Sequence, residues 1–275
     1  MNKLVASGLL AATLVSSACG KVKGTEAMPD ARNVEHDIDA SAPDAAAALG
    51  SKDHPAKSCV ELQVAGAKSG PYWLQPTGLD AVETYCDQDT NGGGWALVVN
   101  SVKTDGKTLI FWQFPYADRF KTAGTPAPDQ NFYAGSLYKA GTTYMDVIAD
   151  LNGKSTVAMI ASTTGIDPDT MRFAKPELIS GNKSLFDFHF AAGWSSADHD
   201  GDDHAASNCA ATYNNVAQHY HDCWYYNLGA DVESGIDGGV GPHVDDGIMG
   251  ALGLGLQPSS GGHSQVSRIA RLAKW

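Results

Sequence analysis

Residues 85–99 read YCDQDTNGGGWALVV, which packs a strand end, a tight turn and a second strand into a short segment. Three consecutive glycines require either positive φ angles or a close approach of another backbone segment. The apolar run Trp95–Val99 predicts a strand after the turn, and Val82–Asp87 predicts another before it. The segment therefore predicts two strands joined by a glycine turn.

Upstream of this turn the sequence predicts the start of a folded domain. Ser58 and Glu61 have the spacing of a capping box, which indicates a short helix that ends at Gly66. Residues 69–76, SGPYWLQP, predict a turn and a brief strand. A helix and strands of this length, with 30 Gly and 12 Pro in 275 residues, indicate a globular fold with many turns.

The spacing of Tyr-Cys-Asp, four residues, Gly-Gly-Gly-Trp and Leu-Val resembles the signature of fibrinogen C-terminal domains, which ficolins, tachylectins and angiopoietins share. The similarity spans about residues 58–275 and becomes clear again at Asp198–Cys209 and Cys223–Leu228. It implies an α+β fold. The expected parts are a small disulfide-bonded N-terminal subdomain, a central, mainly antiparallel sheet with short helices, and a loop-rich, calcium-binding C-terminal subdomain.

Five cysteines are present, an odd number for a chain that is expected to be exported. The resemblance implies that Cys59 pairs with Cys86 and Cys209 with Cys223, whereas four cysteines alone would allow three connectivities. A zinc site is a competing interpretation, but no Cys-x-x-Cys pair supports it.

Residues 1–18 have the features of a signal peptide, with Lys3, an apolar stretch and small residues before Cys19. The segment resembles a bacterial lipobox, so Cys19 is predicted to be lipidated; ordinary secretion is the alternative. Residues 19–57 lack aromatic side chains and predict a disordered linker ahead of a domain at 58–275. We expect a cell-envelope lipoprotein or a secreted protein that meets a membrane only through its lipid.

The middle of the domain predicts strands, because β-branched or aromatic runs alternate with turn residues. In the last of them, Phe186, Phe188 and Phe190 would face the core and His189 the other side. Near the C-terminus, Gly247–Leu256 predicts a flexible loop and Val266–Leu272 a strand that returns to the central sheet. The predicted central strands are Thr108–Phe114, Tyr144–Leu151, Thr156–Ser162 and Phe186–Phe190.

The net charge of −12 is unevenly spread. Residues 184–267 contain eleven acidic residues and seven of the nine histidines, but no Lys or Arg. Such a segment disfavours nucleic-acid binding, which needs clustered Lys and Arg, and favours cations.

Within this segment, Asp198, Asp200 and Asp202 alternate as calcium ligands of a tight loop do. The resemblance implies that Asp200 and Asp202 bind Ca²⁺ through side chains, that His204 and Ser207 bind through carbonyls, and that Asp198 acts through water. The chain has one residue more than the usual spacing before Cys209. A second calcium group is a weaker hypothesis for Asp237, Asp245 and Asp246.

The resemblance also implies a ligand pocket beside this loop, around the second disulfide. Trp224 stands where the family has a His, and Gly229 where it has an Asn. Aromatic faces can stack on sugars, while histidines and carboxylates orient hydroxyls. The predicted ligand-binding residues are His219, His221, Asp222, Trp224, Tyr225, Tyr226 and His243.

These patterns predict a calcium-dependent, lectin-like binding module for glycans or small exposed epitopes, and not an enzyme. A protein-binding adhesion domain is the first alternative. The second is a metal-dependent hydrolase built from His199, His204, His219, His221 and His243, although no His-Glu-x-x-His helix supports it.

Overall fold

The computed structural model describes residues 48–104, 106–231, 239–257 and 261–275. The predicted signal peptide, Cys19 and most of the predicted linker lie outside these residues. Ala46–Trp275 forms one compact unit. Its packed part begins before Ser58, because Ala56 is fully buried and pairs with Leu74.

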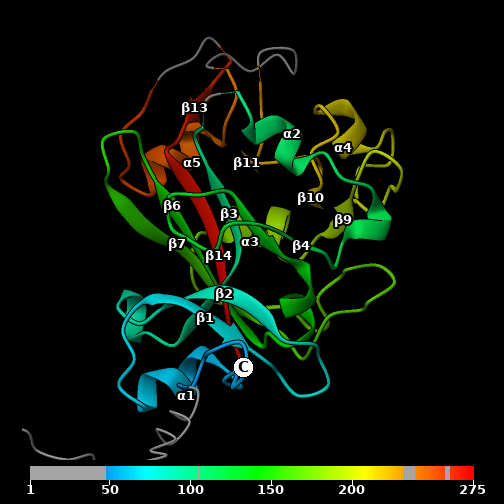
Figure 1. Cartoon of the computed structure of the whole chain (residues 1–275). Coiled ribbons are helices and arrows are strands. Elements are labelled where there is room, and N and C mark those ends of the chain that lie inside the picture. Colours follow the sequence, from blue (N-terminus) through cyan, green and yellow to red (C-terminus); the bar gives the residue numbers. More distant parts are fainter. Residues whose placement is uncertain (1–47, 105, 232–238, 258–260) are drawn as a thin grey trace, which may run out of the picture. The chain divides into compact units, whose positions relative to one another are not determined.

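Nine of the described strands form one antiparallel sheet, in which β1 to β3 are followed by β14, β6, β7 and β8 (Figure 1). Strand β5 pairs with β3 and with β4. The strands of this sheet are β1 (Gly70–Leu74), β2 (Val82–Asp87), β3 (Trp95–Val102), β4 (Thr122–Gly124), β5 (Phe132–Ala134), β6 (Thr143–Ala149), β7 (Ser155–Ser162), β8 (Glu177–Gly181) and β14 (Arg268–Lys274).

The middle of the sheet is covered on both faces. All eight residues of β3 are buried, and the five central residues of β14 are buried beside it. The predicted return of the last strand to the central sheet is confirmed, because β14 pairs with β3 on one side and β6 on the other.

The N-terminal part follows the sequence prediction closely. Helix α1 (Cys59–Val64) starts at Ser58, whose hydroxyl accepts the amide of Glu61. Cys59 is bonded to Cys86, which joins α1 to β2. In the glycine turn, Gly93 has a φ of 67°, and a Cβ there would lie 2.3 Å from the Gln88 carbonyl oxygen. Both expected reasons for glycine therefore apply.

Two predicted strands are helices. Thr108–Phe114 forms α2 (Thr108–Trp112), which buries Thr108 and Trp112, four residues apart. Phe186–Phe190 falls in and just after α3 (Lys183–His189), which the Asn182 side chain caps by accepting the Leu185 amide. Short apolar runs do not distinguish helix from strand. The predicted alternation was wrong, because His189 is buried and Phe188 is half-exposed.

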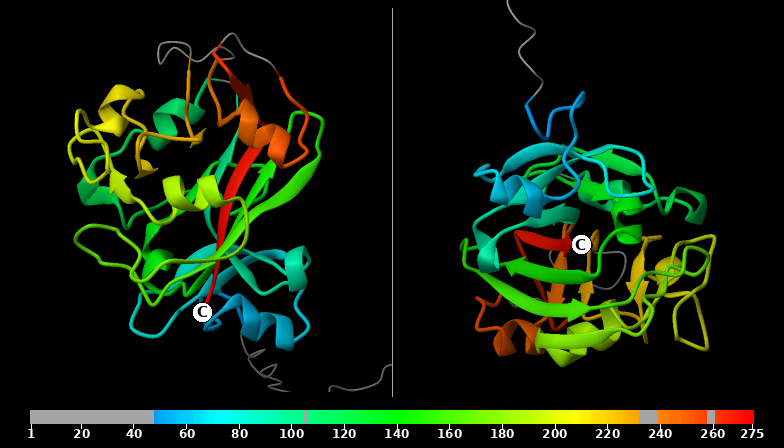
Figure 2. Two further views of the ribbon diagram at one scale, coloured as in Figure 1. Left: turned by 180° about the vertical axis from the view of Figure 1, so that it is seen from behind. Right: turned by 90° about the horizontal axis from the view of Figure 1, so that it is seen from below.

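Smaller elements continue the chain towards the C-terminal subdomain. Seen from behind, α3 lies over a face of the sheet (Figure 2), and it packs against β7 and β10. Two further small sheets consist of β9 with β10, and of β11 with β12 and β13. These elements are β9 (Gly193–Ser195), α4 (Cys209–Thr212), β10 (Gln218–Tyr220), β11 (Tyr226–Asn227), β12 (His243–Asp245), α5 (Asp246–Ala251) and β13 (His263–Gln265).

Helix α5 replaces the start of the flexible loop predicted for Gly247–Leu256. The Asp245 carboxylate accepts the amides of Gly247 and Ile248 and so caps the helix. Ile248 and Met249 are buried on its inner side. A cap and two anchoring apolar side chains therefore outweigh the glycines of this segment.

Candidate functional site at the second disulfide

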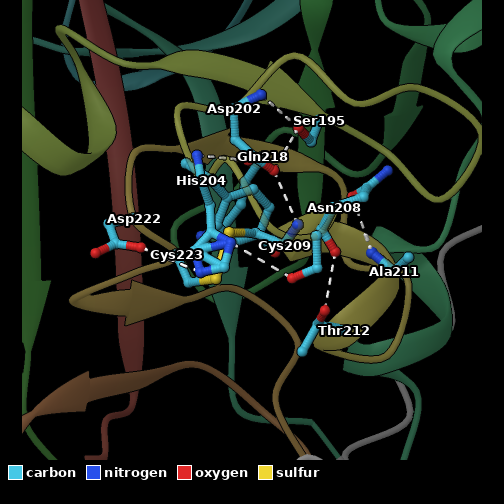
Figure 3. The surroundings of a disulfide bond; sticks show 12 residues. Ser195, Asp202, His204, Asn208, Cys209, Ala211, Thr212, Gln218, Asp222 and Cys223 are labelled. Atoms are coloured by element: carbon cyan, nitrogen blue, oxygen red, sulfur yellow. Dashed lines mark hydrogen bonds and ion pairs between the residues drawn. A yellow bond between two sulfur atoms is a disulfide. The ribbon is translucent and has the colours of Figure 1, made fainter.

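Asp202 fixes the conformation of the acidic loop. Its Oδ2 accepts the Ser195 hydroxyl at 3.0 Å and the Cys209 amide at 2.8 Å, while Oδ1 accepts the His204 amide at 3.0 Å. Figure 3 shows these contacts beside the disulfide. One carboxylate thus ties the loop to both β9 and the first turn of α4.

Asp198 fastens the other end of the loop. Its Oδ1 accepts the Ser196 hydroxyl at 2.6 Å and the Tyr116 amide at 2.9 Å. These two donors, the hydroxyl foremost, lower the pKa of Asp198. The next residue, His199, stacks on the Tyr116 ring with centroids 3.7 Å apart. Asp198 therefore anchors the loop to the segment after α2.

Asp200 is exposed, as Asp198 and Asp203 are, but unlike them it makes no hydrogen bond or ion pair with the described residues. The carbonyl oxygens of His204 and Ser207 likewise accept no hydrogen bond from that part of the chain. Calcium takes carboxylate, carbonyl and water oxygens in irregular geometry. Asp200, Asp202 and these two carbonyls therefore form a donor set whose chemistry fits Ca²⁺.

In the part of the chain that the structure describes, the histidines do not gather into a metal centre. Over the described residues, no group of three or more His, Cys, Asp or Glu side chains is placed to hold a metal ion. A cation at the acidic loop would thus need carbonyl and water oxygens beside its two carboxylates. Of the second calcium group, Asp245 caps α5, Asp246 accepts the Ser264 hydroxyl, and Asp237 lies outside the described residues.

The second disulfide joins the acidic loop to the segment that follows β10. Cys209, the first residue of α4, is bonded to Cys223, whose φ is 62°. The Asp203 amide donates to the His221 carbonyl at 3.1 Å, and His204 Nε2 lies 3.4 Å from Asp222 Oδ1. The loop and residues 221–223 are therefore held side by side (Figure 3).

A cation from outside the acidic segment reinforces this junction. Arg172 Nη2 donates to the Gly201 carbonyl at 2.8 Å and to Asp203 Oδ1 at 2.6 Å. Both side chains are partly exposed, so this ion pair contributes little to global stability. Its effect is local, because it orients the Asp203 backbone that holds His221.

Three ring side chains form a partly exposed cluster next to this junction, which we call the aromatic platform: Phe188, His221 and Tyr225. Phe188 lies 5.0 Å from the His221 ring and 4.3 Å from the Tyr225 ring, between centroids. His221 is exposed and the other two are half-buried. The strand predicted for residues 186–190 placed Phe188 in the core. A helix over residues 183–189 would instead have predicted a surface position for Phe188.

Four of the predicted ligand-binding residues belong to the core instead. Trp224, Tyr226, His219 and His243 are 8%, 5%, 3% and 0% exposed, so their rings cannot serve as a contact surface. Trp224 packs against Tyr213 in a small cluster around the disulfide. Of the other members of the predicted set, His221 and Asp222 are exposed and Tyr225 is half-buried.

A pocket of about 300 Å³ opens on the Asp198 side of the loop. Gln113, Phe114 and Asn215 contribute to its walls together with Asp198. No sequence signal marked it, because its walls come from three segments that are distant in the chain. The loop therefore has the pocket on one side and the aromatic platform on the other.

Behind the platform lies a buried polar network. Arg271 donates from Nε and Nη2 to the two carboxylate oxygens of Asp146, both at 2.7 Å. Its Nη2 also donates to the His189 carbonyl at 2.8 Å and lies 3.1 Å from the Tyr226 hydroxyl. Arg271 and Asp146 are 3% and 0% exposed, so this ion pair is fully desolvated.

Comparison with known proteins assigns the chain to a family. Residues 55–250 match the family described as fibrinogen beta and gamma chains, C-terminal globular domain. The chain therefore belongs to the fibrinogen C-terminal domain family, a family of ligand- and protein-binding modules. This confirms the resemblance inferred from residues 85–99, and the α+β fold with its two disulfides is confirmed as well.

Solved structures show the same fold. The chain is similar to the fibrinogen-like globe domain of human ANGPTL6, with 23% identity, a TM-score of 0.53, and coverage of 79% of this chain and 94% of that one. It is also similar to the corresponding domain of human ANGPTL2, with 18% identity, a TM-score of 0.56, and coverage of 80% and 99%.

Domains of this family are usually extracellular. Across the described residues, no helix is both long enough and apolar enough to cross a membrane.

Proposed function

We propose that the domain is a calcium-dependent, lectin-like binding module that acts outside the cell or at its surface, without catalysis. Its ligand is a glycan or a small exposed epitope. The observation that carries this proposal is the position of the aromatic platform, which is joined to the acidic loop through the Asp203–His221 hydrogen bond and the second disulfide.

The chemistry of the platform favours a neutral, hydroxyl-rich ligand. Aromatic faces stack on the apolar faces of sugar rings, and carboxylate and imidazole groups bind hydroxyls. Phe188 and Tyr225 supply the first kind of contact, and His221 and Asp222 the second. An anionic ligand would instead need Lys or Arg, which residues 184–267 lack.

Calcium would be held by the carboxylates of Asp200 and Asp202 with the carbonyls of His204 and Ser207. When bound, it would supply positive charge and order at the loop. Order in the loop would reach the platform through Asp203. This residue follows Asp202 in the chain, and its amide donates to the carbonyl of the platform residue His221. Export, with anchoring through a lipid on Cys19, belongs to the same proposal; incorporation of a labelled fatty acid into Cys19 tests it.

A glycan array read with and without a chelator tests the binding function. We expect calcium-dependent binding that Tyr225→Ala and Asp200→Asn each weaken at least tenfold. The matched controls are Ile179→Ala, which removes another exposed apolar side chain, and Asp80→Asn, which removes an exposed carboxylate. Both controls should bind as the unaltered domain does.

Two results would overturn the proposal. Glycan binding that survives Tyr225→Ala but is lost on Gln113→Ala would move the ligand to the pocket beside Asp198. Silence on every glycan, together with chelator-sensitive binding to a protein, would favour an adhesion domain. Isothermal titration of the chelated domain with Ca²⁺ checks the metal separately, and an absence of binding heat would refute the site.

A further inference from the structure

The His189 ring is fixed in one protonation state by its neighbours. Its Nδ1 lies 3.0 Å from the His219 carbonyl oxygen, which can only accept, so Nδ1 carries the proton. Its Nε2 lies 3.0 Å from the amides of both Tyr225 and Tyr226, which can only donate. Nε2 is therefore an unprotonated acceptor, and the ring is neutral.

We propose that His189 is an acid-sensitive latch, in which the unprotonated Nε2 holds the backbone of Tyr225 and Tyr226 and thereby positions the aromatic platform. His189 acts through this backbone and is a positioning residue. The importance of the latch for ligand binding rests on the proposed function, whereas the latch itself does not.

The segment is anchored at its carbonyls as well, because the Tyr225 carbonyl accepts the Asp245 amide and the Tyr226 carbonyl accepts the Gln218 side chain. The amides of Tyr225 and Tyr226, by contrast, both donate to His189. Strand β11 has two residues, Tyr226 and Asn227, and pairs with β12. The Tyr226 ring stacks on the His189 ring with centroids 3.7 Å apart. The platform residue Phe188 directly precedes His189 in α3. The amide of Tyr225, a second platform residue, donates a hydrogen bond to the His189 ring. The same histidine thus connects two of the three platform residues.

The groups around His189 oppose a second proton on its ring. From β14, Arg271 donates to the His189 carbonyl; from β6, Asp146 is already paired with Arg271. From β10, the His219 carbonyl accepts from Nδ1 and acts in the opposite direction, but more weakly than burial; from β11, the Tyr226 ring stacks on the imidazole. Burial, with Arg271 and the His219 ring as weaker causes, holds the pKa of His189 well below its usual range.

Protonation at Nε2 would place an N–H group against two N–H donors. The contacts to Tyr225 and Tyr226 would then become repulsive, and the segment would have to move away from α3. Once the segment has opened, His189 is in contact with water and titrates near 6.5, so opening takes up one proton below that pH. The equilibrium constant for opening therefore rises about tenfold for each pH unit below 6.5. The sign is thus fixed: the platform is held at neutral pH and released in acid.

Amide hydrogen exchange of the whole chain, followed by NMR from pH 7.5 to 5, tests the latch without any ligand. After correction for the intrinsic rate, protection of the Tyr225 and Tyr226 amides should fall about tenfold per pH unit below 6.5. Amides of β14, such as that of Ala270, should keep their protection. Loss of protection at all these amides together would mean global unfolding and would overturn the latch.

Two variants separate His189 from general acid sensitivity. His189→Gln keeps an acceptor that does not titrate, and should flatten the pH dependence at Tyr225 and Tyr226. His219→Gln is the matched control, because His219 is another buried histidine whose ring contacts neither amide; it should keep the tenfold slope. An unchanged slope in His189→Gln would refute the proposal.

A direct measurement covers the case in which His189→Gln fails to fold. Nitrogen-15 shifts of the His189 ring in the unaltered domain should show a protonated Nδ1 and an unprotonated Nε2 at pH 7. The opposite tautomer would overturn the latch. If the domain binds no glycan but the Tyr225 and Tyr226 amides still lose protection in acid through His189, the latch is supported and only the proposed function is refuted.

Discussion

Replacing Arg271 by Met is expected to destabilise the domain by about 3–5 kcal/mol, because it leaves the buried carboxylate of Asp146 without its partner. Arg271 donates to both oxygens of that carboxylate at 2.7 Å, and neither residue has access to bulk water. The substitution also removes a donor from the His189 carbonyl. The large cost therefore comes from an uncompensated buried charge and not from a strong net attraction.

Urea unfolding at pH 7, followed by tryptophan fluorescence with the disulfides intact, measures this cost. The double variant Arg271→Met with Asp146→Leu should recover most of the loss, since replacing both charges removes the desolvation penalty. Arg172→Met is the matched control, because its ion pair with Asp203 is partly exposed and should be worth less than about 1 kcal/mol. A loss below about 1 kcal/mol for Arg271→Met, or a double variant no more stable than it, would refute the reasoning.

Three further predictions concern stability. Gly93→Ala should cost about 1–3 kcal/mol in urea unfolding because of strain at positive φ and the clash of its Cβ; Gly78→Ala, also at positive φ but with nothing within 4 Å, should cost less, and equal costs would contradict the clash. Removing the second disulfide as Cys209→Ser with Cys223→Ser should cost about 3 kcal/mol for its short loop, and an unchanged melting temperature would contradict this. Burial lowers the pKa of His219 to about 3. The histidine is therefore neutral when folded, and its contribution, complete above pH 6.5, should be lost at about 1.4 kcal/mol per unit as pH falls towards 3; His219→Gln should show a shallower loss between pH 7 and 5, and an equal loss would contradict this.

The N-terminal elements were predictable because their signals are local, whereas the α+β fold as a whole followed from the family resemblance. The turn at Gly92–Gly94, the cap at Ser58 and the strands beside them each depend on residues within a few positions. They needed no knowledge of tertiary contacts. The two disulfide pairings followed from the family resemblance, and without it three connectivities would have remained.

The two strands that proved to be helices show where local pattern fails. Phe186, Phe188 and Phe190 alternate with polar residues, as a strand requires, but five residues are too few to separate a period of two from one of 3.6. The Asn182 cap favours the helix, because its side chain accepts the Leu185 amide. His189 was consequently placed outside the core, and its role behind the platform could not be foreseen.

The acidic loop was located from sequence, but four of the seven residues predicted for the neighbouring ligand surface are buried. Carboxylates at alternate positions are a local pattern, whereas the direction of Trp224 depends on the backbone at Cys223. That residue has a φ of 62°, a conformation unusual for a non-glycine residue. It helps to turn the Trp224 ring inward and leaves Tyr225 outside.

The position of β14 has a consequence for the order in which the domain folds. The hairpin of β1 and β2 joins residues that are close in the chain and can form during synthesis. By contrast, β3 pairs with β14 across a gap from Val102 to Arg268, so these two central strands of the sheet meet only after Lys274 has been made. Long-range pairing of this kind slows folding. We therefore expect the apolar edges of β3 and β6 to stay unprotected until the last strand inserts between them, which makes the late folding intermediate the form most prone to aggregation.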